Sequence, residues 1–159
     1  MPGKASSQQP NSLVETGLET PEYGWTMFNG LAHPKSRGRL LLSGSDATDP
    51  ILIESNSLSE PEDMAAALAA GELCRMLGNS DSFAPPVKGE TAPGARDRSG
   101  MINFIQRSAV TYWHQSCTAK MGRDSMSVVD NKLKVYGIGG LRIADASVMQ
   151  ASPVFMCRR

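Results

Sequence analysis

The sequence Thr111-Tyr-Trp-His-Gln-Ser-Cys-Thr-Ala-Lys-Met-Gly122 opens the most specific stretch of this chain, which continues to Met149. It contains His114, one of only two histidines in 159 residues, beside two bulky aromatic side chains. An imidazole titrates near neutral pH, so His114 can take a proton from a substrate hydroxyl and return it. From residue type alone, a structural histidine packed against aromatics is the commoner explanation. His114 is therefore the leading candidate for proton transfer in this chain, with a structural role as the alternative.

A glycine-rich turn and a second candidate site follow within the same stretch. Gly137-Ile-Gly-Gly-Leu-Arg142 begins like a dinucleotide-binding fingerprint, but Arg142 occupies the position of the third glycine, so a plain turn is expected. The apolar run over 141–144 predicts a buried strand, after which Asp145 can cap a helix that begins at Ala146. The exposed N–H groups of such a helix end could stabilise negative charge on a cofactor's oxygen atoms. Equally, Asp145 could do no more than cap its own helix.

The rest of the pattern predicts two helices and a small sheet. Ser59 and Glu62 have the spacing of a capping box, so a helix is expected over residues 60–77, with Gly78-Asn79 at its end. Apolar residues at helical spacing predict a second helix over 99–109. Extended segments are expected near 23–28, 39–43, 51–53, 128–129 and 133–136, of which the second and third would form a hairpin. Helices and strands without regular alternation give an α+β fold class, with a mixed or antiparallel sheet and packed helices.

Composition limits the classes of partner. The formal net charge is zero and both signs are interspersed, which gives no electrostatic footprint for nucleic acid. No apolar run approaches the roughly 18–20 residues of a membrane span, and the N-terminus lacks the apolar core of a secretory signal. The three cysteines have no CxxC spacing and two histidines are too few for a zinc set, so no metal site is expected. Reduced thiols and a cytoplasmic location are the simplest expectation.

Six blocks of sequence occur here in the order and spacing of one flavoenzyme family. They are Pro34-Lys-Ser-Arg-Gly-Arg-Leu40, Asp49-Pro50, Leu58-Ser-Glu-Pro-Glu-Asp-Met64, Trp113-His-Gln-Ser-Cys-Thr-Ala-Lys-Met-Gly122, Ser127-Val-Val-Asp130, and Leu133-Lys-Val-Tyr-Gly-Ile-Gly-Gly-Leu-Arg-Ile-Ala-Asp-Ala-Ser-Val-Met149. From about Pro34 to Met149 the chain resembles the C-terminal, substrate-binding portion of the glucose–methanol–choline (GMC) oxidoreductases. No single block is decisive, but together they are a strong signal.

The resemblance implies roles for four residues. His114 matches the histidine that lies at the flavin ring and acts as the base on the substrate alcohol. Trp113 would lie beside the flavin, and Asp145 and Ala146 would contact the FAD. The implied chemistry is hydride transfer from a small-molecule alcohol to FAD.

This sequence also differs from the family's pattern in two places. The family's FAD-binding half, with its glycine fingerprint, is absent from the sequence. After Met149 the family continues with proline and then a second active-site His or Asn, which Gln150-Ala-Ser-Pro-Val-Phe-Met-Cys-Arg-Arg159 does not match. The expected organisation is a disordered segment over 1–20, an incomplete GMC C-terminal domain over 21–149 and an atypical tail over 150–159.

These inferences lead to one functional expectation and two alternatives. The expected function is that of the C-terminal portion of an FAD-dependent oxidoreductase acting on the CH–OH group of alcohol donors, with His114 as base. As an isolated chain it would be inactive, unless a separate chain supplies the FAD-binding half. The alternatives are a non-catalytic truncated remnant and a small interaction module that has reused the fold.

Overall fold

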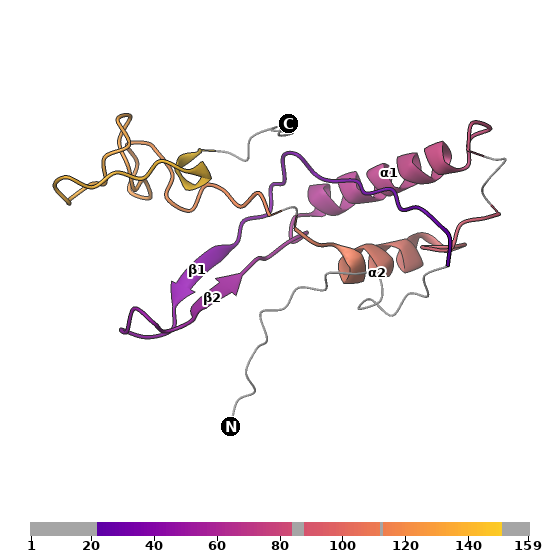
Figure 1. Ribbon diagram of the computed structural model, residues 1–159, viewed down its shortest axis with the longest axis horizontal. Coiled ribbons are helices and arrows are strands. Elements are labelled where there is room, and N and C mark those ends of the chain that lie inside the picture. Colours follow the sequence, from indigo (N-terminus) through magenta and orange to yellow (C-terminus); the bar gives the residue numbers. More distant parts are fainter. Residues whose placement is uncertain (1–21, 84–87, 112, 151–159) are drawn as a thin grey trace, which may run out of the picture. The chain divides into compact units, whose positions relative to one another are not determined.

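The described elements are two strands, two helices and one short helical turn. The computed structural model describes residues 22–83, 88–111 and 113–150. The elements follow the order β1 (Arg39–Leu42), β2 (Ile51–Glu54), α1 (Pro61–Gly78), α2 (Arg98–Ser108) and the 3-10 turn η2 (Ala146–Val148) (Figure 1). The chain divides into two compact units: 22–30, 64–83 and 88–111 are the described residues of one, and 31–63 and 113–150 those of the other. The segment expected at 1–20 lies outside the described residues, as does the tail expected over 150–159 except for Gln150.

Strands β1 and β2 form the expected antiparallel hairpin. Asp46, Thr48 and Asp49 close the turn between them, with Thr48 N–H and hydroxyl both donating to the Asp46 carboxylate. Opposite residues in the register share a face of the hairpin. One face therefore carries only aliphatic side chains and the other carries an aliphatic pair and the Arg39–Glu54 ion pair. All eight strand residues are exposed.

Helix α1 matches the helix expected over 60–77, but its N-terminus is built differently from the prediction. The capping box of Ser59 and Glu62 is not formed in the described structure. Ser59 Oγ instead accepts from Asn56 Nδ2 at 3.1 Å, and the Glu62 carboxylate pairs with Lys35 Nζ at 2.7 Å. The prediction was wrong because Glu62 pairs with Lys35 from a segment distant in sequence, while Ser59 pairs with Asn56 in the preceding turn.

A buried carboxylate, Asp63, connects the start of α1 to the segment that precedes β1. It is 4% exposed and accepts hydrogen bonds from the Lys35 N–H at 2.8 Å, the Ser36 N–H at 2.7 Å and the Ser36 hydroxyl. Burial alone would raise the pKa of Asp63, but these three donors outweigh it and leave the pKa below its ordinary value. We call these three hydrogen bonds the Asp63 latch.

Helix α2 confirms the helix expected over 99–109 and begins one residue earlier. Asp97 is its N-cap, and its carboxylate accepts from the Gly100 N–H at 2.7 Å. Met101 is 7% exposed, and its methyl group would lie 3.6 Å from a Cβ at Gly71. That distance is an ordinary van der Waals contact, so the Met101 side chain of α2 packs on α1 at Gly71, and the two helices lie side by side in Figure 1.

The aromatic segment near 23–28 is not a strand, contrary to expectation. Trp25 stacks on Phe83 with ring centroids 5.0 Å apart, and its ring lies over Gly78 at the end of α1. Strand formation needs a hydrogen-bonding neighbour, whereas aromatic side chains can pack equally well on a helix. Here the packing on the helix end decides the conformation.

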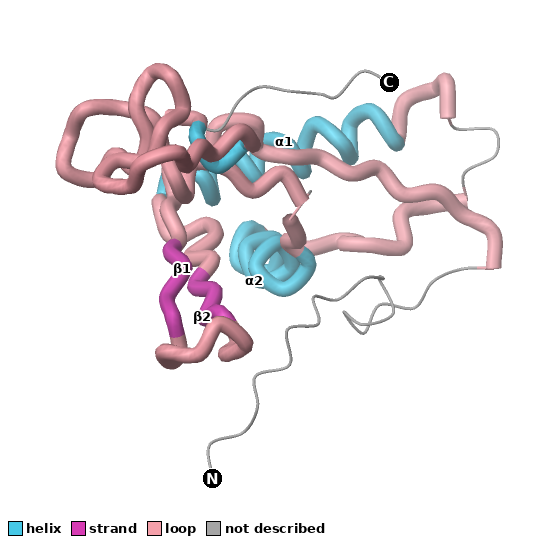
Figure 2. The backbone as a smooth tube through the Cα atoms, turned by 60° about the vertical axis from the view of Figure 1, so that its left-hand side comes forward, coloured by secondary structure: helices cyan, strands magenta, loops and turns pink. Residues whose placement is uncertain are grey.

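Residues 113–150, which we call the C-terminal module, consist mostly of loops and turns (Figure 2). The extended pieces expected at 128–129 and 133–136 appear as isolated bridges, Met121 with Val129 and Val129 with Val135. Val129 is 0% exposed and is the centre of this packing. The buried strand expected over 141–144 is not formed: Leu141 is 46% exposed and the segment makes a single bridge, from Arg142 to Lys134. Apolar composition alone did not show that this segment lies at the module's surface.

Helices with an antiparallel hairpin agree with the α+β expectation, but the sheet of the described residues has only two strands. Neither helix in this part of the chain is long and apolar enough to cross a membrane.

We predict that Asp63→Asn lowers the free energy of unfolding by about 2–3 kcal/mol at neutral pH, because buried donors lose a charged acceptor. The folded-state pKa of Asp63 lies below the ordinary 3.8. The latch therefore contributes stability that is present above the unfolded-state pKa and is lost as the pH falls through the folded-state pKa. Denaturant unfolding from neutral to acid pH should show a steeper loss of stability in the wild type than in Asp63→Asn.

Glu62→Gln is the matched control, because it removes a carboxylate from the same helical turn. Its ion pair with Lys35 is more than half exposed on both side chains, so stability should change little. If both variants lost the same amount of unfolding free energy, the Asp63 latch would contribute no more than an exposed ion pair.

Candidate active site

His114 lies in a segment without regular secondary structure, bounded by two unusual backbone conformations. Trp113 has φ +58° and Cys117 has φ +73°, both in the left-handed region that L-residues other than glycine rarely adopt. His114 is exposed, and no hydrogen bond of its imidazole is found within the described part of the chain. Trp113 is 67% exposed. The expected aromatic burial of His114 is therefore not seen, and the ring is open to a ligand.

Three backbone hydrogen bonds join this segment to the Asp145–Ala146 turn. The N–H groups of Cys117, Ala119 and Met121 donate at 3.2, 2.9 and 2.8 Å. Their acceptors are the consecutive carbonyls of Ala146, Ser147 and Val148. We call this arrangement the backbone ladder. It brings two segments about 30 residues apart in sequence together, as the combined assignment of His114 and Asp145 to one site requires.

Asp145 is an N-cap, as expected, but the helix that it caps is only the three-residue turn η2. Its carboxylate accepts from the Ser147 N–H at 2.8 Å. The Ser147 side chain and then its N–H hold the pKa of Asp145 below its ordinary value. A three-residue 3-10 turn builds no appreciable helix dipole, so the expected stabilisation by a helix end is not supported. The Ala146 N–H, by contrast, is engaged by no hydrogen bond within the described residues.

Asp130 organises the turn behind this site, a role that the sequence analysis missed. Its carboxylate accepts from the Lys132 and Lys134 N–H groups at 2.8 and 2.9 Å. The Lys134 N–H bond is the leading cause that keeps the pKa of Asp130 below its ordinary value. Aspartate followed by Asn131-Lys132 is a typical signal for such a turn and could have revealed it.

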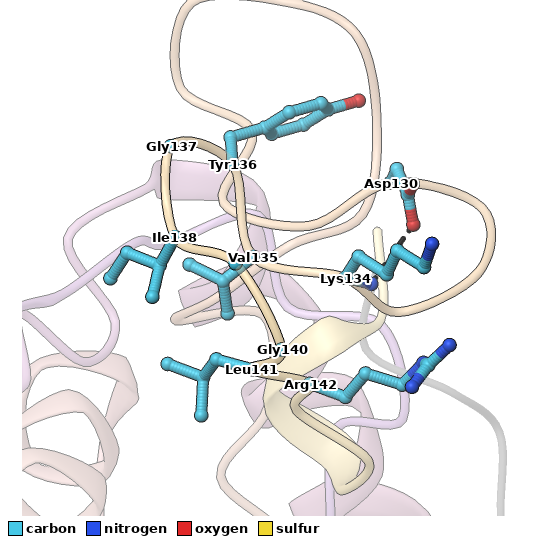
Figure 3. Close-up of a pocket in the computed structure, with 10 residues that line it drawn as sticks. Asp130, Lys134, Val135, Tyr136, Gly137, Ile138, Gly140, Leu141 and Arg142 are labelled. Carbon is cyan, nitrogen blue, oxygen red and sulfur yellow. Dashed lines mark hydrogen bonds between the residues drawn. The ribbon is translucent and has the colours of Figure 1, made fainter.

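The segment 137–140 is a turn, as expected, and not a nucleotide-binding loop. Gly137 and Gly140 both have φ +78°, and no α-helix follows them within the described residues. Residues 134–142 with Asp130 surround an open hollow of about 420 Å³. In Figure 3 the aliphatic side chains of Val135, Ile138 and Leu141 lie on one side of this turn, and those of Lys134 and Arg142 on the other.

Comparison with known proteins tests the family resemblance found in the sequence. The sequence pattern of the family described as GMC oxidoreductase matches residues 34–156. The chain is 37% identical over 129 residues to an alcohol dehydrogenase (acceptor) of Pseudomonas putida. It is 35% identical over 130 residues to an oxygen-dependent choline dehydrogenase of Pseudomonas aeruginosa. Each alignment covers 80% of this chain and 23% of the relative.

Two solved structures share the fold. The pyridoxine 4-oxidase from Mesorbium loti aligns with a TM-score of 0.71 at 32% identity, over 77% of this chain and 25% of the other. A fungal aryl-alcohol oxidase aligns with a TM-score of 0.69 at 33% identity, over 78% and 21% respectively. The chain thus spans about a quarter of the length of these relatives. The resemblance found in the sequence is confirmed: the chain belongs to the GMC oxidoreductase family and corresponds to its C-terminal portion.

Proposed function

We propose that this chain is the substrate-binding part of an FAD-dependent oxidoreductase that oxidises the CH–OH group of a small-molecule alcohol. The observation that carries the proposal is the backbone ladder, which joins the segment bearing His114 to the turn bearing Asp145 and Ala146. Relatives named as an alcohol dehydrogenase and an aryl-alcohol oxidase support the substrate class. The family, which is generally FAD-dependent, supports the cofactor.

His114 is the base in this proposal. The alcohol O–H proton passes to a ring nitrogen of His114, while the hydrogen on the carbinol carbon leaves with its electron pair and the C–O bond becomes a carbonyl. FAD, when bound, supplies the acceptor of that hydride. The exposed imidazole of His114, without a hydrogen bond in the described structure, suits a group that must receive a substrate hydroxyl.

Trp113, Asp145 and Ala146 are proposed to face the FAD. The exposed Trp113 ring offers an aromatic surface to a flavin, and the Ala146 N–H is free to donate to a cofactor oxygen. The Asp145 carboxylate already accepts from Ser147, so Asp145 would act through its backbone and through the shape of η2. The residues thus fit a flavin, with the carboxylate itself in a structural role.

The proposed site is incomplete in the chain alone. Trp113, the candidate flavin neighbour, is 67% exposed, and the aliphatic face of the hairpin is uncovered in the described residues. We propose that a separate FAD-binding half completes the site and that the isolated chain is inactive. A non-catalytic remnant or an interaction module would instead remain inactive when such a half is supplied.

The first test follows FAD binding and turnover with and without an FAD-binding half. We expect the purified chain to leave the flavin absorption and fluorescence of added FAD unchanged. Co-expression with the FAD-binding remainder of the Pseudomonas putida relative should give a flavoprotein that oxidises alcohols. In that complex, His114→Ala should lower turnover by about a hundredfold or more while FAD content stays near the unsubstituted level.

His33→Ala is the matched control, since His33 is the other histidine and is also exposed. It should leave turnover unchanged. Tight stoichiometric FAD binding by the lone chain would contradict the incomplete site, and full turnover in His114→Ala would remove His114 from the mechanism.

A second prediction concerns Asp145. Asp145→Ala removes the acceptor for the Ser147 N–H and should weaken FAD binding by the complex by roughly fivefold, because an N-cap is lost. Asp145→Asn keeps a side-chain oxygen in place and should bind FAD nearly as the wild type does. Fluorescence titration measures both. If the two variants lose affinity equally, the carboxylate charge matters and its assignment as a structural cap is wrong.

A further inference from the structure

The spacing of the hydrogen bonds in the backbone ladder fixes how residues 117–121 align with residues 146–148. Alternate N–H groups, of residues 117, 119 and 121, meet consecutive carbonyls, of residues 146, 147 and 148. The Ala146 carbonyl also accepts from the Met149 N–H at 3.3 Å, and the ladder supplies donors to the Ser147 and Val148 carbonyls that follow it. Residues 117–121, which include a turn at 118–119, supply those donors, and a slip of one residue would break all three bonds. The ladder therefore sets a register, as strand pairing does in a sheet.

Cys117 is the first residue of the ladder and the one with an unfavourable backbone. Its φ of +73° places it in the left-handed region, which strains any L-residue except glycine and, to a lesser extent, asparagine or aspartate. Its N–H is nevertheless directed at the Ala146 carbonyl at 3.2 Å. His114 lies three residues before this turn in the backbone. The direction in which the His114 segment leaves the ladder thus depends on the conformation at Cys117.

The Cys117 thiol makes no strong interaction in the described structure. The Cys117 Sγ donates only locally within the described residues, to the hydroxyl of its neighbour Ser116 at 3.4 Å, which is a weak interaction. No disulfide forms, since Cys117 is a free cysteine. The chemistry at this position is therefore in the backbone.

We propose that Cys117 is a positioning residue. Its left-handed backbone, locked by the ladder, orients the segment of His114 relative to the Asp145–Ala146 turn. The relevance of this orientation to catalysis rests on the proposed function. The orientation itself is a property of this chain alone.

The test compares four substitutions at Cys117 by their tolerance of a positive φ. Glycine adopts it freely, asparagine tolerates it, alanine is strained much as cysteine is, and β-branched valine is strained most. In the purified chain, NMR should show amide exchange at Ala119 and Met121 that is unchanged or slower in Cys117→Gly and Cys117→Asn, and unchanged in Cys117→Ala. In Cys117→Val exchange should be roughly tenfold faster and the His114 ring resonances should shift.

Two outcomes would overturn the proposal. If the Gly, Asn and Ala variants all lose protection together, the thiol is what matters at this position. If Cys117→Val leaves the ladder amides and the His114 resonances as in the wild type, the backbone conformation has no positioning role. If Cys117→Val fails to fold, the test is whether the ladder amides are better protected in Cys117→Gly or in Cys117→Ala. At an ordinary φ glycine is the less protected of the two, whereas here it should be the more protected.

Leu133→Val is the matched control within the C-terminal module. Leu133 also has a left-handed backbone, with φ +63°, but it lies in the Asp130 turn rather than in the ladder. This variant should destabilise its own turn and leave the His114 resonances unshifted. A shift as large as that of Cys117→Val would show that any strain in the module reaches His114, which contradicts a specific role for Cys117.

The NMR arm needs neither FAD nor turnover, so its result is separable from the proposed function. An intact register in a complex that never oxidises alcohols would refute the function and leave the positioning standing. In an active complex, Cys117→Val should lower turnover and Cys117→Gly should retain it; equal activity in both would refute the positioning alone.

Discussion

The backbone ladder between residues 117–121 and η2 is the interaction on which the proposed site depends. Its three hydrogen bonds are the link that brings the His114 segment to the Asp145–Ala146 turn. Neither side contributes a regular helix or strand of its own, so the ladder also satisfies backbone groups that would otherwise lack partners. The register of the chain is therefore a main determinant of the proposed site.

This reliance on the backbone reflects how few side chains are buried. Within the described residues, four apolar side chains and one carboxylate are buried: Ala67, Leu68, Met101, Val129 and Asp63. Many large apolar residues, including those of the hairpin, are exposed. A small core contributes little hydrophobic stabilisation, so polar interactions such as the Asp63 latch make up a larger share of the free energy of unfolding. The relatives are about four times as long, and such exposed apolar surface is typical of faces that contact further protein.

Local signals in the sequence were sufficient where the chain interacts with itself over short distances. The hairpin, both helices, the turn at Gly137–Gly140 and the cap at Asp145 were all predicted, because turn residues, periodicity and caps act within a few residues. Helix α1 shows the limit of this reasoning. Its extent was right, but the capping box did not form, because Glu62 pairs with Lys35 from a distant segment and Ser59 accepts from Asn56.

The sequence by itself determined the family, the candidate base His114 and the helices, since these depend on motif order and local periodicity. Tertiary structure alone decided that Trp25 packs on Phe83 instead of joining a strand, and that Leu141 lies at the surface. It also decided that Cys117 takes a left-handed backbone beneath the ladder. No local rule predicts a strained cysteine there, because the compensating hydrogen bonds come from carbonyls about 30 residues away in the chain.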